Sequence, residues 1–217
     1  MTLPRVHCAF AAICALFTGG CATLKHASLP ATPAPENFFS PATPGEQLRR
    51  VALLPLYSGA FPDQNLRALD AAFQSELSKR GLFEVVPVSR ARLEALFGER
   101  QFSSTEELPA DVFSRLREEC GVDGVLFTDL THFSPYRPVS MGVRTKLVAA
   151  STGQIRWAFD YVFDAGNAAV ADAAKRFQIT HSNEQQPLTT DGGSILLSPS
   201  RFAKYVANET YSSLGRE

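Results

Sequence analysis

Two neighbouring segments of alternating residues constrain the fold of this chain more than any other part of its sequence. Apolar or uncharged side chains occupy every second position of residues 141–147, and again of residues 155–163. Successive side chains of a β-strand point to opposite faces, so each segment predicts a strand with one buried face. The Ser-Thr-Gly turn at 151–153 joins them, which predicts an antiparallel hairpin with Trp157 in the core.

The other face of this hairpin carries charges of both signs, on Arg144, Lys146, Arg156, Asp160 and Asp164. A face opposite the core of an antiparallel sheet is normally solvated. We interpret Arg144, Lys146, Arg156 and Asp160 as a candidate binding surface, because mixed charges favour complementarity to a specific protein over attraction to lipid or nucleic acid. Two alternatives stay open: the charges only keep the face soluble, or the partner binds the polar loop 178–193.

Three further strands and five helices are expected. The strands span 51–56, 83–88 and 123–133, and the helices begin at Asp63, Arg90, Pro109, Asn167 and Pro199. The order β-α-β-α-α-β-β-β-α-α predicts an α/β (α+β) domain, residues 49–217, with a single mixed five-stranded sheet and packed helices. The strand 83–88 is expected at or near one edge, where Pro87 is tolerated although it donates no hydrogen bond. The closing hairpin supplies the other edge.

The first twenty residues have the pattern of a signal peptide. Arg5 precedes an apolar run of ten residues, 8–17, and Gly19-Gly20-Cys21 follows it. This ending resembles the lipobox of bacterial lipoproteins, although Thr18 stands where Leu, Val or Ile is usual. The resemblance implies that residues 1–20 are removed and that Cys21 becomes the acylated (palmitate-bearing) first residue. The alternative is an ordinary signal peptide cut near Gly20, with Cys21 free.

Residues 21–48 are rich in Pro, Ala and Thr and predict a tether between the lipid and the domain. Only Phe38-Phe39 interrupts this composition, as an aromatic pair that could dock on the domain. After processing, Cys120 is the one cysteine left for the folded chain, so we expect no intramolecular disulfide and a buried, unreactive thiol. The net charge of −1 and pI of about 6.4 give no electrostatic basis for nucleic-acid binding.

No signature of catalysis or of cofactor binding stands out. The chain lacks the G-x-G-x-x-G, G-x-S-x-G, H-E-x-x-H and C-x-x-C patterns. Asp129 and His132 are a conceivable acid–base pair, but at three residues' separation on one strand they are expected on opposite faces. The polar segment 189–193 lacks the further acids of a calcium loop. We therefore expect no enzyme, no metal and no cofactor.

Several longer stretches together resemble a known envelope domain. They are VALLPL from Val51, GVDGVLFTDLT from Gly121, GVRTKLVAASTGQIRWAFD from Gly142 and SPSRFAKYV from Ser198. Over 49–211 the chain is similar to the TolB amino-terminal / CsgG / LpoB-like α/β domain. The resemblance implies a periplasmic interaction module without catalytic residues. It departs from the pore-forming CsgG kind, because 134–140 is short and no extra pair of membrane strands is available.

These observations predict a membrane-anchored lipoprotein that acts as a non-catalytic protein-binding module in the cell envelope. Ala22 and Thr23 follow Cys21 without the Asp that signals inner-membrane retention in enteric bacteria, so the resemblance implies the outer membrane, with the domain facing the periplasm. The expected partner is another envelope protein, and self-association is left open. Two alternatives remain: a subunit of a secretion or trans-envelope assembly, and an unrecognised enzyme.

Overall fold

The computed structural model describes residues 38–41, 47–59, 63–181 and 193–215. All of them belong to one compact unit, Thr32–Glu217. The predicted signal peptide, Cys21 and most of the predicted tether therefore lie outside the described residues. The strands are β1 Phe38–Phe39, β2 Arg50–Leu53, β3 Glu84–Pro87, β4 Gly124–Ser134, β5 Ser140–Ala149 and β6 Ile155–Asp164. The helices are α1 Asp63–Lys79, α2 Arg90–Phe97, α3 Val112–Cys120, α4 Ala168–His181, the 3-10 helix η1 Gly193–Leu197 and α5 Pro199–Tyr211.

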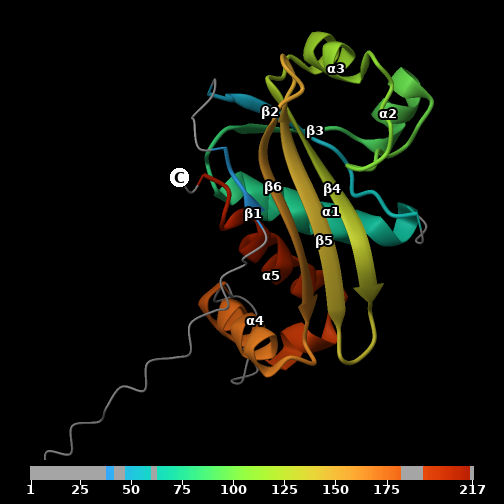
Figure 1. Cartoon of the computed structure of the whole chain (residues 1–217). Coiled ribbons are helices and arrows are strands. Elements are labelled where there is room, and N and C mark those ends of the chain that lie inside the picture. Colours follow the sequence, from blue (N-terminus) through green and yellow to red (C-terminus); the bar gives the residue numbers. More distant parts are fainter. Residues whose placement is uncertain (1–37, 42–46, 60–62, 182–192, 216–217) are drawn as a thin grey trace, which may run out of the picture. The chain divides into compact units, whose positions relative to one another are not determined.

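One mixed sheet runs through the unit in the order β1-β6-β5-β4-β2-β3 (Figure 1). β2 is parallel to β3 and to β4, whereas β4, β5, β6 and β1 are antiparallel neighbours. The mixed sheet and the hairpin are confirmed, and β3 lies at one edge, as Pro87 predicted. The predicted element order is kept from β2 to α5, with η1 added between α4 and α5.

The prediction of five strands is wrong, because the sheet has six. The additional strand, β1, pairs Phe38 with Phe159 and Phe39 with Ala158. Two residues are too short to show an alternation of their own, so no periodic signal marked this strand. The aromatic pair singled out within the tether does dock on the domain, and it does so as an edge strand.

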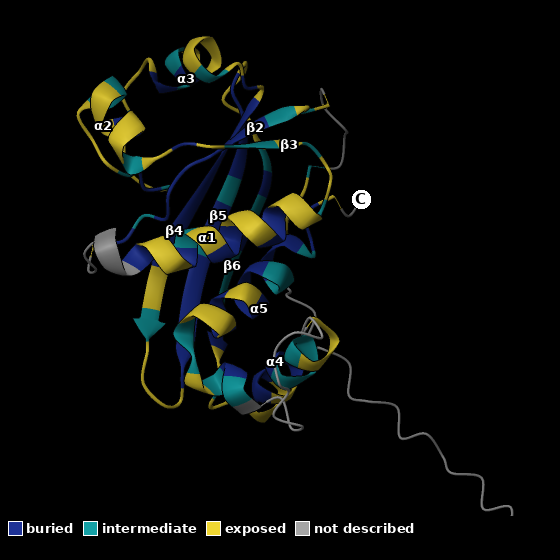
Figure 2. Cartoon of the chain, turned by 180° about the vertical axis from the view of Figure 1, so that it is seen from behind, coloured by how far each residue is buried: buried dark blue, intermediate teal, exposed yellow. Residues whose placement is uncertain are grey.

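The first face of the sheet packs against α1, α4 and α5 (Figure 2). Leu66, Leu69, Phe73 and Leu77 lie on one side of α1 and are at most 3% exposed. Their 3-4-4 spacing places them on one helical face, which explains why this helix buries that side. Trp157 is 2% exposed in the same cluster, which confirms its predicted place in the core.

The second face is covered by α2 and α3 over only part of its area (Figure 1). Ala52, Leu54, Val125 and Phe127 form the centre of this smaller core, with Leu93 of α2 and Leu116 of α3. Ser89 caps α2 by accepting a hydrogen bond from the Arg92 amide, and Gly98 ends the helix in the left-handed conformation. α3 begins at Val112, later than the expected Pro109, and ends at Gly121 as predicted.

A β-bulge changes the face of the sheet on which the last side chains of β4 lie. The pairing of β4 with β5 shifts between Leu130 and His132, so that Asp129 lies opposite Arg144 and His132 lies opposite Gly142. A bulge inserts one extra residue and reverses the alternation beyond it. The expectation that Asp129 and His132 lie on opposite faces is therefore wrong: both lie on the second face.

The predicted polar loop 178–193 is also shorter than expected. α4 continues to His181, beyond the predicted end at residue 177, and Asn167 starts this helix by accepting a hydrogen bond from the Ala169 amide at 2.9 Å. Residues 182–192 lie outside the described residues, and they include most of the polar segment 189–193, for which no calcium site was expected. Of the helices in the described part, none combines the length and apolar character needed to cross a bilayer.

Candidate functional site

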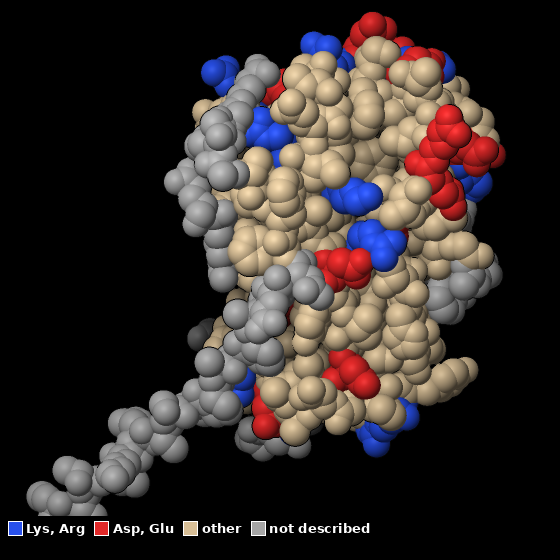
Figure 3. Space-filling view, in the orientation of Figure 1, with Lys and Arg blue, Asp and Glu red and all other residues tan. Residues whose placement is uncertain are grey.

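Three of the four residues interpreted as a binding surface, Arg144, Lys146 and Asp160, lie on one face of β5 and β6, which we call the outer face. It is the part of the second face that α2 and α3 leave uncovered. The register aligns Asp129, Arg144 and Asp160 across three strands, and aligns Lys146, Ala158 and Phe39 across the next level. Figure 3 shows basic and acidic side chains close together near the middle of this view.

Arg144 and Asp160 form an ion pair across β5 and β6. The Arg144 Nε donates to Asp160 Oδ2 at 2.7 Å, and the two side chains are 36% and 48% exposed. An exposed ion pair contributes only about 0–1 kcal/mol to folding, so this pair has little effect on stability. It does fix two of the candidate charges in a defined arrangement on the surface.

Lys146 and Asp129 hold the loop between α2 and α3 on the outer face. The Lys146 Nζ donates to the Ser104 carbonyl oxygen at 2.6 Å. Asp129, 4% exposed, accepts from the Ser104 amide and the Ser104 hydroxyl, both at 2.8 Å, and from the Ser103 hydroxyl at 3.3 Å. These bonds satisfy a carboxylate that would otherwise be costly to bury.

Sequence analysis missed this role of Asp129. The available signal was an acid inside the apolar run VLFTDL, because a carboxylate in a buried strand requires donors from elsewhere in the chain.

Tyr57 also contacts the loop between α2 and α3. Its hydroxyl donates to Glu106 Oε1 at 2.6 Å, and this hydrogen bond is the main cause that raises the pKa of Tyr57 above its usual value of 10.0.

Arg156 differs from the other three candidate residues. It is half-buried and lies at a β-bulge, between Ile155, which pairs with Val148, and Trp157, which pairs with Leu147, and within the described part of the chain it makes no hydrogen bond or ion pair. Its guanidinium group is therefore available to an acidic group of a partner. The structure places Arg144, Lys146 and Asp160 on one face and Arg156 at the adjoining bulge of β6, and it joins only Arg144 to Asp160 directly.

The outer edge of β6 is the second feature of this surface. β6 has ten residues, and among the described residues only the two of β1 pair with its outer side. Phe38 and Phe39 are 41% and 50% exposed, and Val162 on β6 is 50% exposed. A hollow of about 290 Å³ lies between β1 and the outer face, lined by Phe38, Phe39, Arg144, Thr145, Lys146, Ala158, Phe159 and Asp160.

The conceivable acid–base pair is not assembled, although the bulge brings both residues to one face. The His132 Nε2 shares a 2.8 Å hydrogen bond with the Ser140 hydroxyl. Asp129 is occupied by Ser103 and Ser104. The residues that the structure describes contain no group of three or more His, Cys, Asp or Glu suited to a metal ion, and Cys120 is free and half-buried.

Comparison with known proteins gives structural neighbours only. No protein-family model matches the chain, and no curated protein matches it in sequence. The similar solved structures include lipoprotein GNA1162 from Neisseria meningitidis, with a TM-score of 0.40 and 19% identity over 61% of this chain and 97% of that one. The PelC dodecamer from Paraburkholderia phytofirmans has a TM-score of 0.39 and 12% identity, over 80% and 95%.

The carboxy-terminal domain of LpoB from Escherichia coli is also similar, with a TM-score of 0.35 and 15% identity over 55% of this chain and 86% of that one. LpoB was one of the three proteins that the sequence resembles; the TolB and CsgG parts of the resemblance are not confirmed. All three likenesses have TM-scores under 0.5, so no conclusion about the function of this chain rests on them.

Proposed function

We propose that the chain is an envelope lipoprotein, anchored by lipid on Cys21 to the outer membrane, whose domain binds another envelope protein without catalysis. The observation that supports the binding role is the surface of β6. Among the residues that the structure describes, two of its ten residues are paired on the outer edge, and no helix packs on the adjoining outer face. Edge strands offer unpaired N–H and C=O groups to a partner, while the charges select which partner fits.

Site-specific photo-crosslinking in living cells tests this proposal. A photoreactive residue at Val162 on the outer face, or at Arg156 in the bulge of β6, is expected to give an adduct with another envelope protein. The matched controls are Leu82, before β3, and Ile179, on α4, which are 45% and 50% exposed and lie away from the outer face. Adducts from the controls alone would contradict the proposed surface. Adducts only with a second copy of the chain would favour a self-assembling subunit instead.

Charge reversal separates recognition from folding. Arg144→Glu together with Arg156→Glu is expected to weaken capture of the crosslinked partner while the melting temperature changes little, because both side chains are exposed or half-buried. The control Arg144→Glu with Asp160→Arg restores an internal ion pair in the opposite direction. If the variant with the swapped pair captures the partner normally, the ion pair matters only for local structure. If capture stays weak, the partner contacts the positive charge of Arg144 directly.

A further inference from the structure

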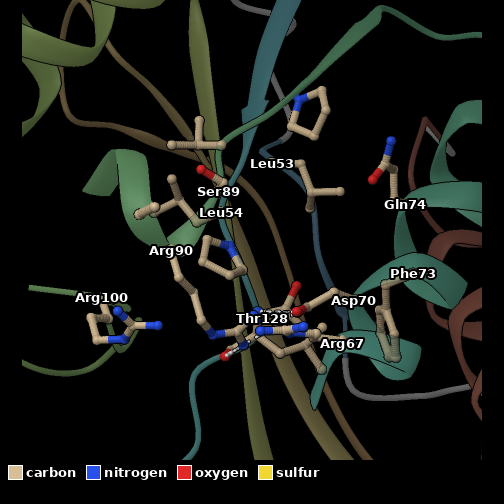
Figure 4. Close-up of a pocket in the computed structure, with 15 residues that line it drawn as sticks. Leu53, Leu54, Arg67, Asp70, Phe73, Gln74, Ser89, Arg90, Arg100 and Thr128 are labelled. Atoms are coloured by element: carbon tan, nitrogen blue, oxygen red, sulfur yellow. Dashed lines mark hydrogen bonds and ion pairs between the residues drawn. The ribbon is translucent and has the colours of Figure 1, made fainter. Parts of the chain in front are cut away.

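A second concave site lies at the carboxyl ends of the parallel strands, away from β5 and β6. α1 packs on the first face of the sheet and α2 on the second, so a groove of about 470 Å³ opens between them beyond β2 and β3 (Figure 4). In open sheets with helices on both faces, the crevice beyond the carboxyl ends of parallel strands is where ligands bind. The volume suits a small molecule.

The wall of this groove is apolar over much of its area. The residues after β2 contribute Leu54 and Pro55, α1 contributes Phe73, and the end of β3 with the residue after it contributes Pro87 and Val88, of which Pro87 is the exposed one. Pro55 and Pro87 have no amide hydrogen, so the backbone at these strand ends offers fewer hydrogen-bond donors to water in the groove. Such a surface suits the apolar body of a ligand.

Basic groups dominate the charges of the groove. Arg67, Arg90 and Arg100 line it, with Asp70 as the one acid among the lining residues. Asp70 accepts the Leu56 amide hydrogen at 2.9 Å and forms an ion pair with Arg90, which also donates to the Leu56 carbonyl oxygen at 2.9 Å. The single negative charge is therefore already balanced, and Asp70 and Arg90 serve to fix the groove wall.

Arg67 is the basic residue of the groove whose guanidinium group is available to bind an anion. It lies three residues before Asp70 on the same side of α1, is exposed, and makes no ion pair within the described residues. Arg100, by contrast, is paired with Glu94 at 2.5 Å. Ser89, Arg90 and Ala91 also line the groove, so the positive end of the α2 dipole lies at its rim.

We infer that this groove binds a small amphipathic anion: a carboxylate held by the Arg67 guanidinium, with an apolar body against the exposed side chains of Pro87 and Ala91. The inference is independent of the proposed protein-binding surface, because none of the groove residues belongs to β5 or β6. It adds a ligand site to a domain for which catalysis is not proposed.

Titration of the purified full chain with naphthaleneacetate and with naphthaleneacetamide tests the inference by isothermal calorimetry. The two probes share one apolar ring system and differ in charge. The carboxylate is expected to bind at least about tenfold more tightly than the amide, because a charge-assisted hydrogen bond is roughly twice as strong as a neutral one. Higher salt is expected to weaken only the carboxylate.

Three variants locate the site. Arg67→Gln is expected to lower the affinity for the carboxylate to that for the amide, and Ala91→Trp, which fills the rim, to weaken both probes. Arg156→Gln in the bulge of β6 is the matched control and is expected to change neither affinity. Equal binding of the two probes, or unchanged carboxylate binding in Arg67→Gln with an unchanged melting temperature, would overturn the inference. Undetectable binding of both probes at millimolar concentration would also overturn it.

Discussion

At the scale of single residues, Trp157 is central to the larger core. It is 2% exposed, its ring stacks beside Phe159 with centroids 6.2 Å apart, and its Nε1 donates to the Ser213 hydroxyl at 3.2 Å. Trp157→Ala is therefore expected to lower the free energy of unfolding by about 3–5 kcal/mol, measured by urea denaturation. Trp157→Phe, which keeps most of the volume, should cost less. Unchanged stability in the alanine variant would show that the indole is not a core group.

Asp129 acts through hydrogen bonds and not through apolar contacts. Asp129→Asn keeps the size of the side chain but removes its charge and one of its acceptor oxygens. We expect a loss of about 2 kcal/mol, because hydrogen bonds to a charged group contribute about 1.5–3 kcal/mol each and an unpaired buried group is costly. Faster hydrogen exchange at the Ser104 amide should accompany this loss.

The exposed carboxylate of Asp160 provides the comparison for Asp129. Asp160→Asn removes only the exposed ion pair with Arg144 and should cost under about 1 kcal/mol. If both variants lose the same free energy of unfolding, the burial of Asp129 does not increase its contribution to stability. The two measurements together separate a buried anchor of the loop from a surface charge.

At the scale of elements, regular periodicity explains what could be predicted. The hairpin of β5 and β6 and the buried face of α1 were predicted because apolar residues recur at every second position, or at every third to fourth position, over seven or more residues. Ser89 marked a helix start because its hydroxyl oxygen can accept an amide hydrogen bond, and Gly98 and Gly121 marked helix ends because few other residues adopt the left-handed conformation. Each of these signals lies within one local stretch of sequence.

The features that escaped prediction depend on contacts between distant residues. β1 exists because β6, more than a hundred residues later, offers an unpaired edge. The bulge in β4 is set by the pairing with β5, and it moved His132 to the face of Asp129. The four candidate surface residues were predicted on one face from their alternation, but the internal partner of Lys146 is a carbonyl in a loop forty-two residues earlier.

The bulge in β4 can be tested through Gly142, which lies opposite His132. A Cβ atom at this position would come within 2.6 Å of Thr131 Oγ1 and 3.0 Å of His132 Cβ. Gly142→Ala should therefore destabilise the protein by about 1–3 kcal/mol in thermal or urea unfolding, as overpacking does. Gly59→Ala is the control, since its Cβ would meet only the Tyr57 hydroxyl at 3.6 Å. A stable Gly142→Ala protein would show that the bulge adjusts without cost.

At the scale of the whole molecule, the two proposed surfaces use different parts of one sheet. The outer face belongs to the antiparallel strands β5 and β6, and the groove belongs to the ends of the parallel strands β2 and β3. A mixed sheet supplies both, because its parallel half leaves a crevice between helices and its antiparallel half leaves a face on which none of the described helices packs. Variants at Arg67 and at Arg156 should therefore act separately.

The membrane anchor is the remaining prediction at this scale, and it rests on the ten apolar residues 8–17 followed by Gly19-Gly20-Cys21. If Cys21 is acylated, the natural chain fractionates with membranes, and mass spectrometry of its first peptide finds lipid on Cys21. Cys21→Ser should then leave unprocessed precursor or release the chain to the soluble fraction. Ala22→Asp keeps the cysteine and tests the destination, since retention in the inner membrane is expected to follow. An unmodified mature chain that begins elsewhere would refute the anchor, while the fold and both surfaces of residues 49–217 would stand.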